Sequence, residues 1–323
     1  MTNRREFLKN TSLVAATGVL AATSVSAATV SELSKINVSK NFGLQIYSLG
    51  QELAPDIPGG LKRVREMGYS SIELAFYDIA GGTVANMRMA DFKKHADDAG
   101  LKIQSSHVGL PIRGAWTREN FEQAKDSWKT ACAQNVSMGS KYIIHPGDPP
   151  ARNSEELANV CEVLNEAGKV AREAGLTFAF HNHQNEYRRV VPGGTERLPF
   201  GQTGSAGRGQ PPPEGTKMVY DGMIEGTDPS LVQFELDVYW CVIGQQDPVE
   251  YMNRYPNRIR LLNIKDRQIL GQSGMMNFQK IFETAYSYGV DNFFVELEGY
   301  RTGTQFEGVK GCAHYLLSSR FVR

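Results

Sequence analysis

The sequence predicts an α/β protein with the architecture of a single-domain (β/α)8 TIM barrel, and two patterns lead to this prediction. Eight short segments rich in apolar residues alternate with amphipathic segments of helical periodicity. Several helical segments also end in a glycine just before the next apolar run, at Gly68, Gly100 and Gly175, as expected where a helix ends in a left-handed residue. Strands that alternate with helices form a parallel sheet, and eight of them can close into a barrel.

The length of the chain, 323 residues of which 41% are hydrophobic and 22% are charged, suits either two ordinary domains or one large barrel. A doubly wound open sheet is the alternative, but it would need a glycine-rich phosphate-binding loop after the first strand, and the sequence has none there. The expected strands, in chain order, are residues 43–48, 70–75, 102–108, 141–147, 176–183, 232–240, 259–266 and 292–299.

Residues 1–28 are expected to be an export signal that precedes the barrel, which we expect over residues 41–323. A basic start with Arg4 and Arg5 leads into a mildly apolar stretch and then into small residues. The twin arginines followed by Glu-Phe-Leu-Lys resemble a Tat signal, which a receptor reads. The apolar stretch is too short and too rich in Ala, Thr and Ser for a membrane span, and no cysteine nearby could carry a lipid anchor. Cleavage near Ala28 would leave a periplasmic protein; the alternative is a cytoplasmic N-terminal helix.

Charge and cysteine usage narrow the classes of partner. Thirty-five basic side chains balance thirty-five acidic ones, so the chain has no global field that would attract a polyanion, and nucleic acid is not an expected partner. The four cysteines are widely spaced without a CxxC pair, which favours buried thiols over a disulfide framework or a zinc site. The sequence leaves the oligomeric state open. The cysteines are Cys132, Cys161, Cys241 and Cys312.

One segment interrupts the alternation of strands and helices. Residues 188–215 are rich in Gly, Pro and Arg and have no periodic apolar face. They follow the fifth expected strand, so in a barrel they would start at the C-terminal mouth, where barrel active sites lie. Long loops in compact domains are commonly lids, binding loops or disordered insertions. We expect a loop that covers a substrate, with a disordered insertion as the alternative.

Polar residues gather at the C-terminal ends of the expected strands, where a purely structural barrel would not need them. Four of the six histidines are among them. Since the C-terminal ends of all barrel strands meet at one mouth, we expect these side chains to converge. In chain order they are His107, His145, His181, His183, Asp237, Asn263, Lys265 and Glu296.

Imidazole nitrogens and carboxylate oxygens that converge from different strands can bind a borderline divalent metal ion. For each histidine taken alone, a hydrogen-bonded core residue is an equally good interpretation. For Asp237 and Glu296 that interpretation is weaker, because a buried carboxylate is costly without a cation.

Four strings in this chain resemble the xylose-isomerase-like barrel superfamily, and in particular bacterial sugar phosphate isomerases/epimerases with a Tat-type signal. They are "FHNHQNEY", "ELDVYW", "DPVEYMNRYPNRIRLLNIKD" and "FFVELE", and the resemblance runs from about residue 41 to the C-terminus. It implies one divalent metal ion, manganese, cobalt or zinc, held by residues of the fifth to eighth strands. The matching positions are His181, Asp237, Asn263 and Glu296, and His145 matches a further ligand position of related endonucleases.

The sequence departs from the family pattern at three of these strand ends. His181 stands where many relatives have Glu, Asn263 where they have His, and Trp240 where some carry a second His. An amide oxygen can coordinate a hard cation but is a poorer ligand for zinc or cobalt than imidazole. Because this chain has Asn263 and Trp240 where relatives carry histidines, it lacks zinc ligands of the related endonucleases, and a multi-zinc nuclease is not expected. The metal ligands we expect are therefore His181, Asp237, Glu296 and His145.

The resemblance also implies chemistry in which a proton moves on a carbon next to a carbonyl. We expect Glu296, His183 and Lys265 as catalytic residues, and His107, Trp240 and Asn263 as substrate-binding residues. Lys265 either has a pKa lowered by burial beside a metal ion or pairs with Asp266 or Glu296. Aromatic side chains, namely Trp240, Tyr47 and Trp116, either stack on a sugar ring or pack in the core.

Three functions remain open at this point. The first is a metal-assisted isomerase or epimerase of a free sugar, and an exported protein is not expected to meet sugar phosphates. The second is a lyase or hydrolase of keto-sugar glycosides that uses the same proton abstraction. The third is a non-catalytic sugar-binding barrel that has lost its metal through Asn263.

Overall fold

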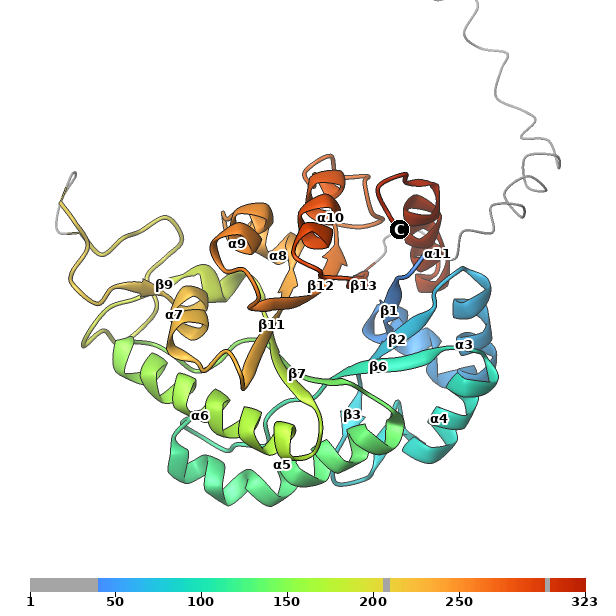
Figure 1. The fold of residues 1–323 in the computed structure, drawn as a ribbon, viewed down its shortest axis with the longest axis horizontal. Coiled ribbons are helices and arrows are strands. Elements are labelled where there is room, and N and C mark those ends of the chain that lie inside the picture. Colours follow the sequence, from blue (N-terminus) through green and yellow to red (C-terminus); the bar gives the residue numbers. More distant parts are fainter. Residues whose placement is uncertain (1–39, 206–209, 300–302) are drawn as a thin grey trace, which may run out of the picture. The chain divides into compact units, whose positions relative to one another are not determined.

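The computed structural model describes residues 40–205, 210–299 and 303–323, and in it eight parallel strands close into a barrel (Figure 1). Each strand pairs with the next barrel strand along the chain, and the last pairs with the first. The predicted (β/α)8 barrel is confirmed. The barrel strands are β1 (Gly43–Gln45), β2 (Ser71–Leu74), β6 (Lys102–His107), β7 (Tyr142–Pro146), β8 (Thr177–His181), β11 (Val232–Asp237), β12 (Ile259–Lys265) and β13 (Asn292–Glu296).

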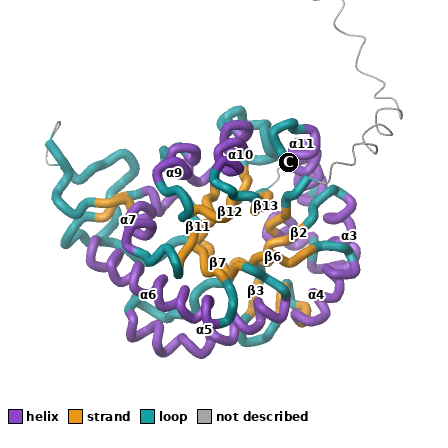
Figure 2. The backbone as a smooth tube through the Cα atoms, viewed as in Figure 1, coloured by secondary structure: helices purple, strands orange, loops and turns teal. Residues whose placement is uncertain are grey.

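The helices surround the ring of strands (Figure 2). They bury their apolar faces against the outside of the barrel, as Leu61 and Val64 do on α3. The helices are α3 (Ile57–Glu66), α4 (Met89–Asp98), α5 (Arg118–Met138), α6 (Ser154–Glu173), α7 (Val219–Gly226), α8 (Val238–Ile243), α9 (Pro248–Arg254), α10 (Phe278–Ser287) and α11 (Gln305–Ser318). Short 3-10 helices are η1 (Ile46–Glu52), η2 (Ala54–Asp56) and η3 (Gln184–Tyr187).

The helix-to-strand joints follow the glycine pattern of the sequence. Gly68, Gly100 and Gly175 have φ of 105°, 74° and 86°, in the left-handed region. A residue with a Cβ rarely adopts this conformation, so glycine ends each of these helices at low cost. The joints expected at these positions are confirmed.

All eight predicted strands extend past the observed ones, and the first, sixth and eighth do so by three residues at their C-terminal ends. The first barrel strand ends at Gln45 rather than at residue 48, because the Gln45 side chain accepts a hydrogen bond from the Tyr47 N–H (2.8 Å) and starts η1. The sixth ends at Asp237 rather than at residue 240, because Asp237 Oδ1 accepts from the Trp240 N–H (2.8 Å) and caps α8. In both places a polar side chain competes with the sheet for a backbone N–H.

The inside of the barrel changes from apolar to polar along the strands. A small inner core of Ile144, Ala179, Leu261 and Phe294 lies apart from the main core between strands and helices. Since side chains alternate between the two faces of a strand, Asn263 follows Leu261 and Glu296 follows Phe294 on the inner face. The polar residues therefore lie toward the C-terminal ends of the strands, on the side predicted from the sequence.

The described part of the Gly/Pro-rich segment, residues 188–205 and 210–215, does not lie across the barrel mouth as expected (Figure 1). This part begins with β9 (Arg189–Val190), which pairs with β10 (Lys217–Met218), and it extends outward beside α6 and α7 (Figure 1). Arg197 fixes it to the loop before α6, donating to the Ala151 carbonyl (2.7 Å) and to Asp148 Oδ1 (2.9 Å). These contacts hold the segment at the rim, so the prediction of a substrate-covering loop is not supported.

The cysteines and the helices can be compared with what the composition of the chain predicts. All four cysteines are buried and unpaired, as predicted. Among the described residues, no helix combines the length and the apolar composition that crossing a membrane needs. The export signal expected over residues 1–28 lies outside the described residues.

Besides the β9–β10 pair, the described residues form one more antiparallel sheet. Strands β3 (Tyr77–Asp78), β4 (Thr83–Val84) and β5 (Met87–Arg88) form a three-stranded sheet after β2. This sheet takes the chain from the end of β2 to α4, so the residues just after β2 are held at the barrel mouth by a folded element.

Candidate active site

Three of the expected metal ligands converge inside the barrel mouth. A ring nitrogen of His181 and one carboxylate oxygen each of Asp237 and Glu296 all lie within 4.8 Å of one another, and the three residues are buried. They come from β8, β11 and β13, whose inner faces meet because the sheet is closed. Burial raises the pKa of Asp237 well above its usual range, although Lys265 opposes the shift.

Lys265 on β12 lies among the carboxylates of this group. Its Nζ is 3.2 Å from Glu296 Oε1, 2.6 Å from Glu298 Oε1 and 4.0 Å from Asp237 Oδ2. Burial would lower the pKa of Lys265, but the three carboxylates outweigh it and the pKa is raised. The ion pair of Lys265 with Glu296 that the sequence suggested is present, and the lowered pKa expected beside a bound metal ion stays a prediction.

Asp266 is not the partner of Lys265. Its carboxylate instead accepts hydrogen bonds from the backbone N–H groups of Arg267 (2.7 Å) and Gly271 (3.0 Å) in the loop that follows.

The charge of Lys265 also affects Glu296: it helps to hold the pKa of Glu296 below its usual range despite the opposing effect of burial. Glu296 is therefore ionised and Lys265 is protonated at neutral pH.

Asn263 is part of the same group. It pairs in register with Asp237, and its Nδ2 donates to Glu296 Oε2 at 2.5 Å. Its Oδ1 is buried and has no hydrogen-bond partner among the described residues. The amide is therefore positioned beside the expected metal ligands, with its oxygen uncommitted.

His183 lies just beyond the end of β8, because the strand stops at His181. The predicted fifth strand, residues 176–183, is therefore too long, yet the rings of His181 and His183 are neighbours, with centroids 5.1 Å apart. Burial lowers the pKa of both His181 and His183 to about 3, so both imidazoles are neutral at pH 7. Trp240 lies next to His183 (centroids 6.1 Å apart), and its ring faces Lys265 Nζ at 4.8 Å.

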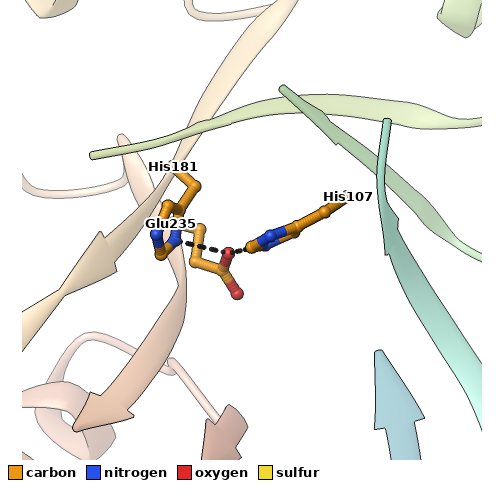
Figure 3. A group of neighbouring side chains, drawn as sticks. All are labelled: His107, His181 and Glu235. Carbon is orange, nitrogen blue, oxygen red and sulfur yellow. Dashed lines mark hydrogen bonds and ion pairs between the residues drawn. The ribbon is translucent and has the colours of Figure 1, made fainter. Parts of the chain in front are cut away.

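His107 belongs to a second group of side chains, together with Glu235 and His181 (Figure 3). Glu73 also joins this group, and neither glutamate was among the predicted site residues. The Nε2 of His107 lies 2.9 Å from Glu235 Oε2 and 3.0 Å from Glu73 Oε1. Glu235 Oε2 is also 3.1 Å from His181 Nδ1. Burial would lower the pKa of His107, but the two carboxylates raise it well above its usual range. His107 therefore acts as a buried cation between two glutamates.

The strand periodicity of two could have identified these missed residues. Glu235 precedes Asp237 by two residues and Glu298 follows Glu296 by two. On the predicted strands, each glutamate would therefore face the same side as a predicted site residue. Glu73 is the inner-face residue of β2 that pairs in register with Gln45 of β1, whose Nε2 donates to it at 3.1 Å.

His145 does not join the group of three. On β7 it has the opposite parity to Ile144, which belongs to the inner core. Its Nδ1 accepts a hydrogen bond from the Leu110 N–H (3.1 Å), and its ring makes an edge contact with Trp116 (4.9 Å). Among the described residues, neither group of possible ligands includes His145. A ligand role for it stays a prediction, and Trp116 is a buried packing residue.

An exposed aromatic pair follows the first two barrel strands. Tyr47 is 50% exposed and Phe76 is 39% exposed, and their rings stack with centroids 5.5 Å apart. Phe76 has φ of 55°, which is rare for a bulky residue. Tyr47 was predicted either to pack in the core or to stack on a sugar, and its exposure excludes the core. No sequence pattern indicated Phe76.

The donor set of the three converging residues suits a divalent metal ion. It offers one imidazole nitrogen and two carboxylates, with the Asn263 oxygen beside them. Asp237 Oδ2 and Asn263 Oδ1 are buried without a hydrogen-bond partner among the described residues, and such atoms are costly to leave unsatisfied. A bound cation would satisfy both atoms. A site with several oxygen ligands favours a harder ion than a site made of imidazoles alone.

Comparison with known proteins gives a consistent picture. A family model described as "Xylose isomerase-like TIM barrel" matches residues 61–312. A sugar phosphate isomerase/epimerase from Parabacteroides distasonis ATCC 8503, solved as a crystal structure, is 41% identical with a TM-score of 0.80, over 90% of this chain and 97% of that one. An L-ribulose 3-epimerase structure is 14% identical with a TM-score of 0.62, over 86% of this chain and 93% of that one, and shares the fold. Inosose dehydratase of Geobacillus thermodenitrificans (strain NG80-2) is 23% identical over 266 residues, 69% of this chain and 78% of the relative.

Proposed function

Because this chain belongs to the xylose isomerase-like TIM barrel family, we propose that it is a metal-assisted isomerase or epimerase of a sugar or sugar derivative. The observation that carries the proposal is the convergence of His181, Asp237 and Glu296 beside the ammonium of Lys265. The 41% identical structure described as a sugar phosphate isomerase/epimerase supports the same reaction class.

His181, Asp237 and Glu296 would hold the ion, with Asn263 Oδ1 as the adjacent oxygen. A bound divalent ion would act as a Lewis acid toward the oxygens of the substrate. The protonated Lys265 would donate a hydrogen bond to the carbonyl oxygen, where negative charge develops as the neighbouring carbon loses its proton. The neutral imidazole of His183 and the ionised carboxylate of Glu296 are the two groups available to accept and return that proton.

The exposed Tyr47–Phe76 pair would bind the apolar face of the sugar ring. Tyr47 and Phe76 lie just after the barrel strands β1 and β2. Ser48, next to Tyr47, accepts a hydrogen bond (2.9 Å) from the backbone N–H of Leu297, the residue after Glu296. This bond ties the aromatic pair to the end of the strand that carries the proposed catalytic carboxylate.

A lyase that acts on a keto-sugar derivative is the second candidate. The same proton abstraction would then be followed by loss of a leaving group from the next carbon, and Lys265 could protonate that group. The curated relatives named inosose dehydratase favour this alternative. A non-catalytic sugar-binding barrel is the third candidate and would bind a sugar without turning it over.

One experiment separates the three candidates. The protein is purified without chelator, analysed for metal, and incubated in deuterated water with free sugars and with keto-glycosides. An isomerase yields an isomer with solvent deuterium at the exchanged carbon, and a lyase yields a product that has lost its leaving group. Asp237→Ala should lose both metal and turnover, while Asp126→Ala, at a 95% exposed side chain on α5, should keep both. Metal-free wild-type protein with full activity would contradict the proposal.

We also propose that the chain is exported to the periplasm, on the basis of the Arg4-Arg5 signal. Replacing both arginines with lysine should leave uncleaved precursor in the cytoplasm, measured by fractionation and immunoblotting. Unchanged export of that variant would indicate another route. An exported enzyme would act on a free sugar rather than a sugar phosphate.

A further inference from the structure

We propose that Glu235 is a positioning residue that determines which ring nitrogen of His181 is free to bind a metal ion. Glu235 on β11 pairs in register with His181 on β8, and its Oε2 lies 3.1 Å from His181 Nδ1 (Figure 3). This inference rests on the proposed metal site at His181, Asp237 and Glu296.

The chemistry of the contact determines the tautomer. A carboxylate oxygen only accepts hydrogen bonds, so His181 Nδ1 must carry the hydrogen when it bonds to Glu235. In a neutral imidazole the other nitrogen, Nε2, then keeps its lone pair. Histidine ligands of metals commonly donate their second N–H to a carboxylate in this way, which orients the ring and raises its basicity. Nε2 is thus the nitrogen left with a lone pair for a metal ion.

Glu235 is itself held in place by a chain of contacts across the barrel. His107 Nε2 lies 2.9 Å from the same Oε2 and 3.0 Å from Glu73 Oε1. Glu73 in turn accepts from Ser105 Oγ (2.6 Å) and Gln45 Nε2 (3.1 Å). Glu235, Glu73, Gln45 and Ser105 have no exposed surface, so water does not compete for these bonds. The contacts hold Glu235 through Oε2, while its Oε1 is buried without a hydrogen-bond partner among the described residues.

A metal ion bound directly by His107, His181 and Glu235 is the competing interpretation, since these three also have ligand atoms within 4.8 Å of one another. Their nitrogen–oxygen distances of 2.9 and 3.1 Å are those of hydrogen bonds. The Nε2 of His107 is also shared with Glu73. The geometry therefore favours a positioning role over a second metal site.

The test uses full-length, metal-stripped protein with 15N-labelled histidine. NMR spectra that correlate the ring hydrogens with the ring nitrogens across two bonds report which nitrogen of His181 carries hydrogen. The His181 signal is assigned by its loss in His181→Gln. Zinc titration reports stoichiometry and affinity. We expect the Nδ1–H tautomer in the wild type and one zinc ion per chain. Glu235→Leu should mix the tautomers and weaken zinc binding by about 10- to 100-fold. Glu235→Gln, which keeps an acceptor oxygen, should retain most of the affinity, and the buried but distant Glu166→Gln should match the wild type.

The outcomes separate the inference from the proposed function. Absence of zinc binding in the wild type would overturn the metal site itself. Zinc binding with unchanged tautomer and affinity in Glu235→Leu would overturn the positioning role alone. Two zinc ions per chain, one of them lost in Glu235→Leu, would assign Glu235 to a site of its own and overturn it as well. If Glu235→Leu fails to fold by circular dichroism, the wild type decides, because an Nε2–H tautomer of His181 in stripped protein contradicts the inference.

Discussion

Gly147 lies directly against the ring of His183: a Cβ at position 147 would be 2.3 Å from His183 Nδ1. Gly147 also has φ of 80°, so both its backbone conformation and the space around it require glycine. The turn after β7 thus fixes the position of an imidazole that follows β8. A residue without a side chain determines where one of the proposed catalytic groups can lie.

Gly147→Ala should displace His183 and lower turnover by at least tenfold. It should also lower the free energy of unfolding by about 1–2 kcal/mol, because alanine is strained in the left-handed region. Steady-state kinetics and urea denaturation measure the two effects. Gly109→Ala is the matched control, since no atom lies within 4 Å of a Cβ built there and its φ is not positive. Wild-type turnover in Gly147→Ala would show that the position of His183 does not matter.

Asn263→His should tighten metal binding if position 263 contributes a ligand. Imidazole nitrogen binds zinc or cobalt better than an amide oxygen does, and Oδ1 of Asn263 has no hydrogen-bond partner among the described residues. Turnover should not rise in parallel, because the substitution removes the hydrogen bond from Nδ2 to Glu296. Titration of stripped protein with cobalt measures the affinity. Affinity equal to the wild type would place position 263 outside the ligand set.

Glu186 should make the stability of the protein depend on pH. Burial raises its pKa to about 7, although the backbone N–H groups of Asp148 (2.6 Å) and His183 (2.9 Å) favour the charged form. Because the folded pKa exceeds the unfolded value of 4.5, folding binds a proton, and stability is lost as the pH rises from about 4.5 through 7. The loss should amount to about 3 kcal/mol at most.

Urea denaturation at pH 5, 6, 7 and 8 measures this effect in the wild type and in Glu186→Gln, which has no proton to lose. The difference in unfolding free energy between the two proteins should shift in favour of Glu186→Gln as the pH rises. Glu162→Gln, at a half-exposed side chain on α6, serves as the control. A difference that stays constant over this range would mean that Glu186 does not titrate there.

Phe76→Asn should weaken sugar binding while costing little stability. Asparagine tolerates the left-handed backbone of position 76 better than phenylalanine, and Phe76 is already 39% exposed. Loss of an aromatic stacking partner is worth about 1 kcal/mol, or roughly fivefold. We therefore expect a roughly fivefold higher KM at unchanged kcat. Met275→Asn, at another exposed apolar residue, should leave KM unchanged; an equal KM in Phe76→Asn would exclude the aromatic pair from substrate binding.

Much of the candidate site follows from local sequence patterns. The parity of strand residues places Asp237, Asn263 and Glu296 inside the barrel, and the same rule applied once more would have added Glu235 and Glu298. For His145, whose position on β7 alternates with that of the inner-face residue Ile144, the same rule predicts a place on the other face of the strand. Local patterns do not show where a strand ends because its last side chain accepts a hydrogen bond from a following backbone N–H, as at Gln45 and Asp237.

The sequence by itself determined the barrel, its helix-to-strand joints and the end of the barrel at which polar residues gather, because periodicity and glycine conformation act over a few residues. Only the tertiary structure decided which of these residues touch. Glu235 meets both His107 and His181, and Tyr47 stacks on Phe76, because closure of the sheet brings distant strands together. Such contacts depend on register and closure across the whole ring, and no segment of the chain encodes these alone.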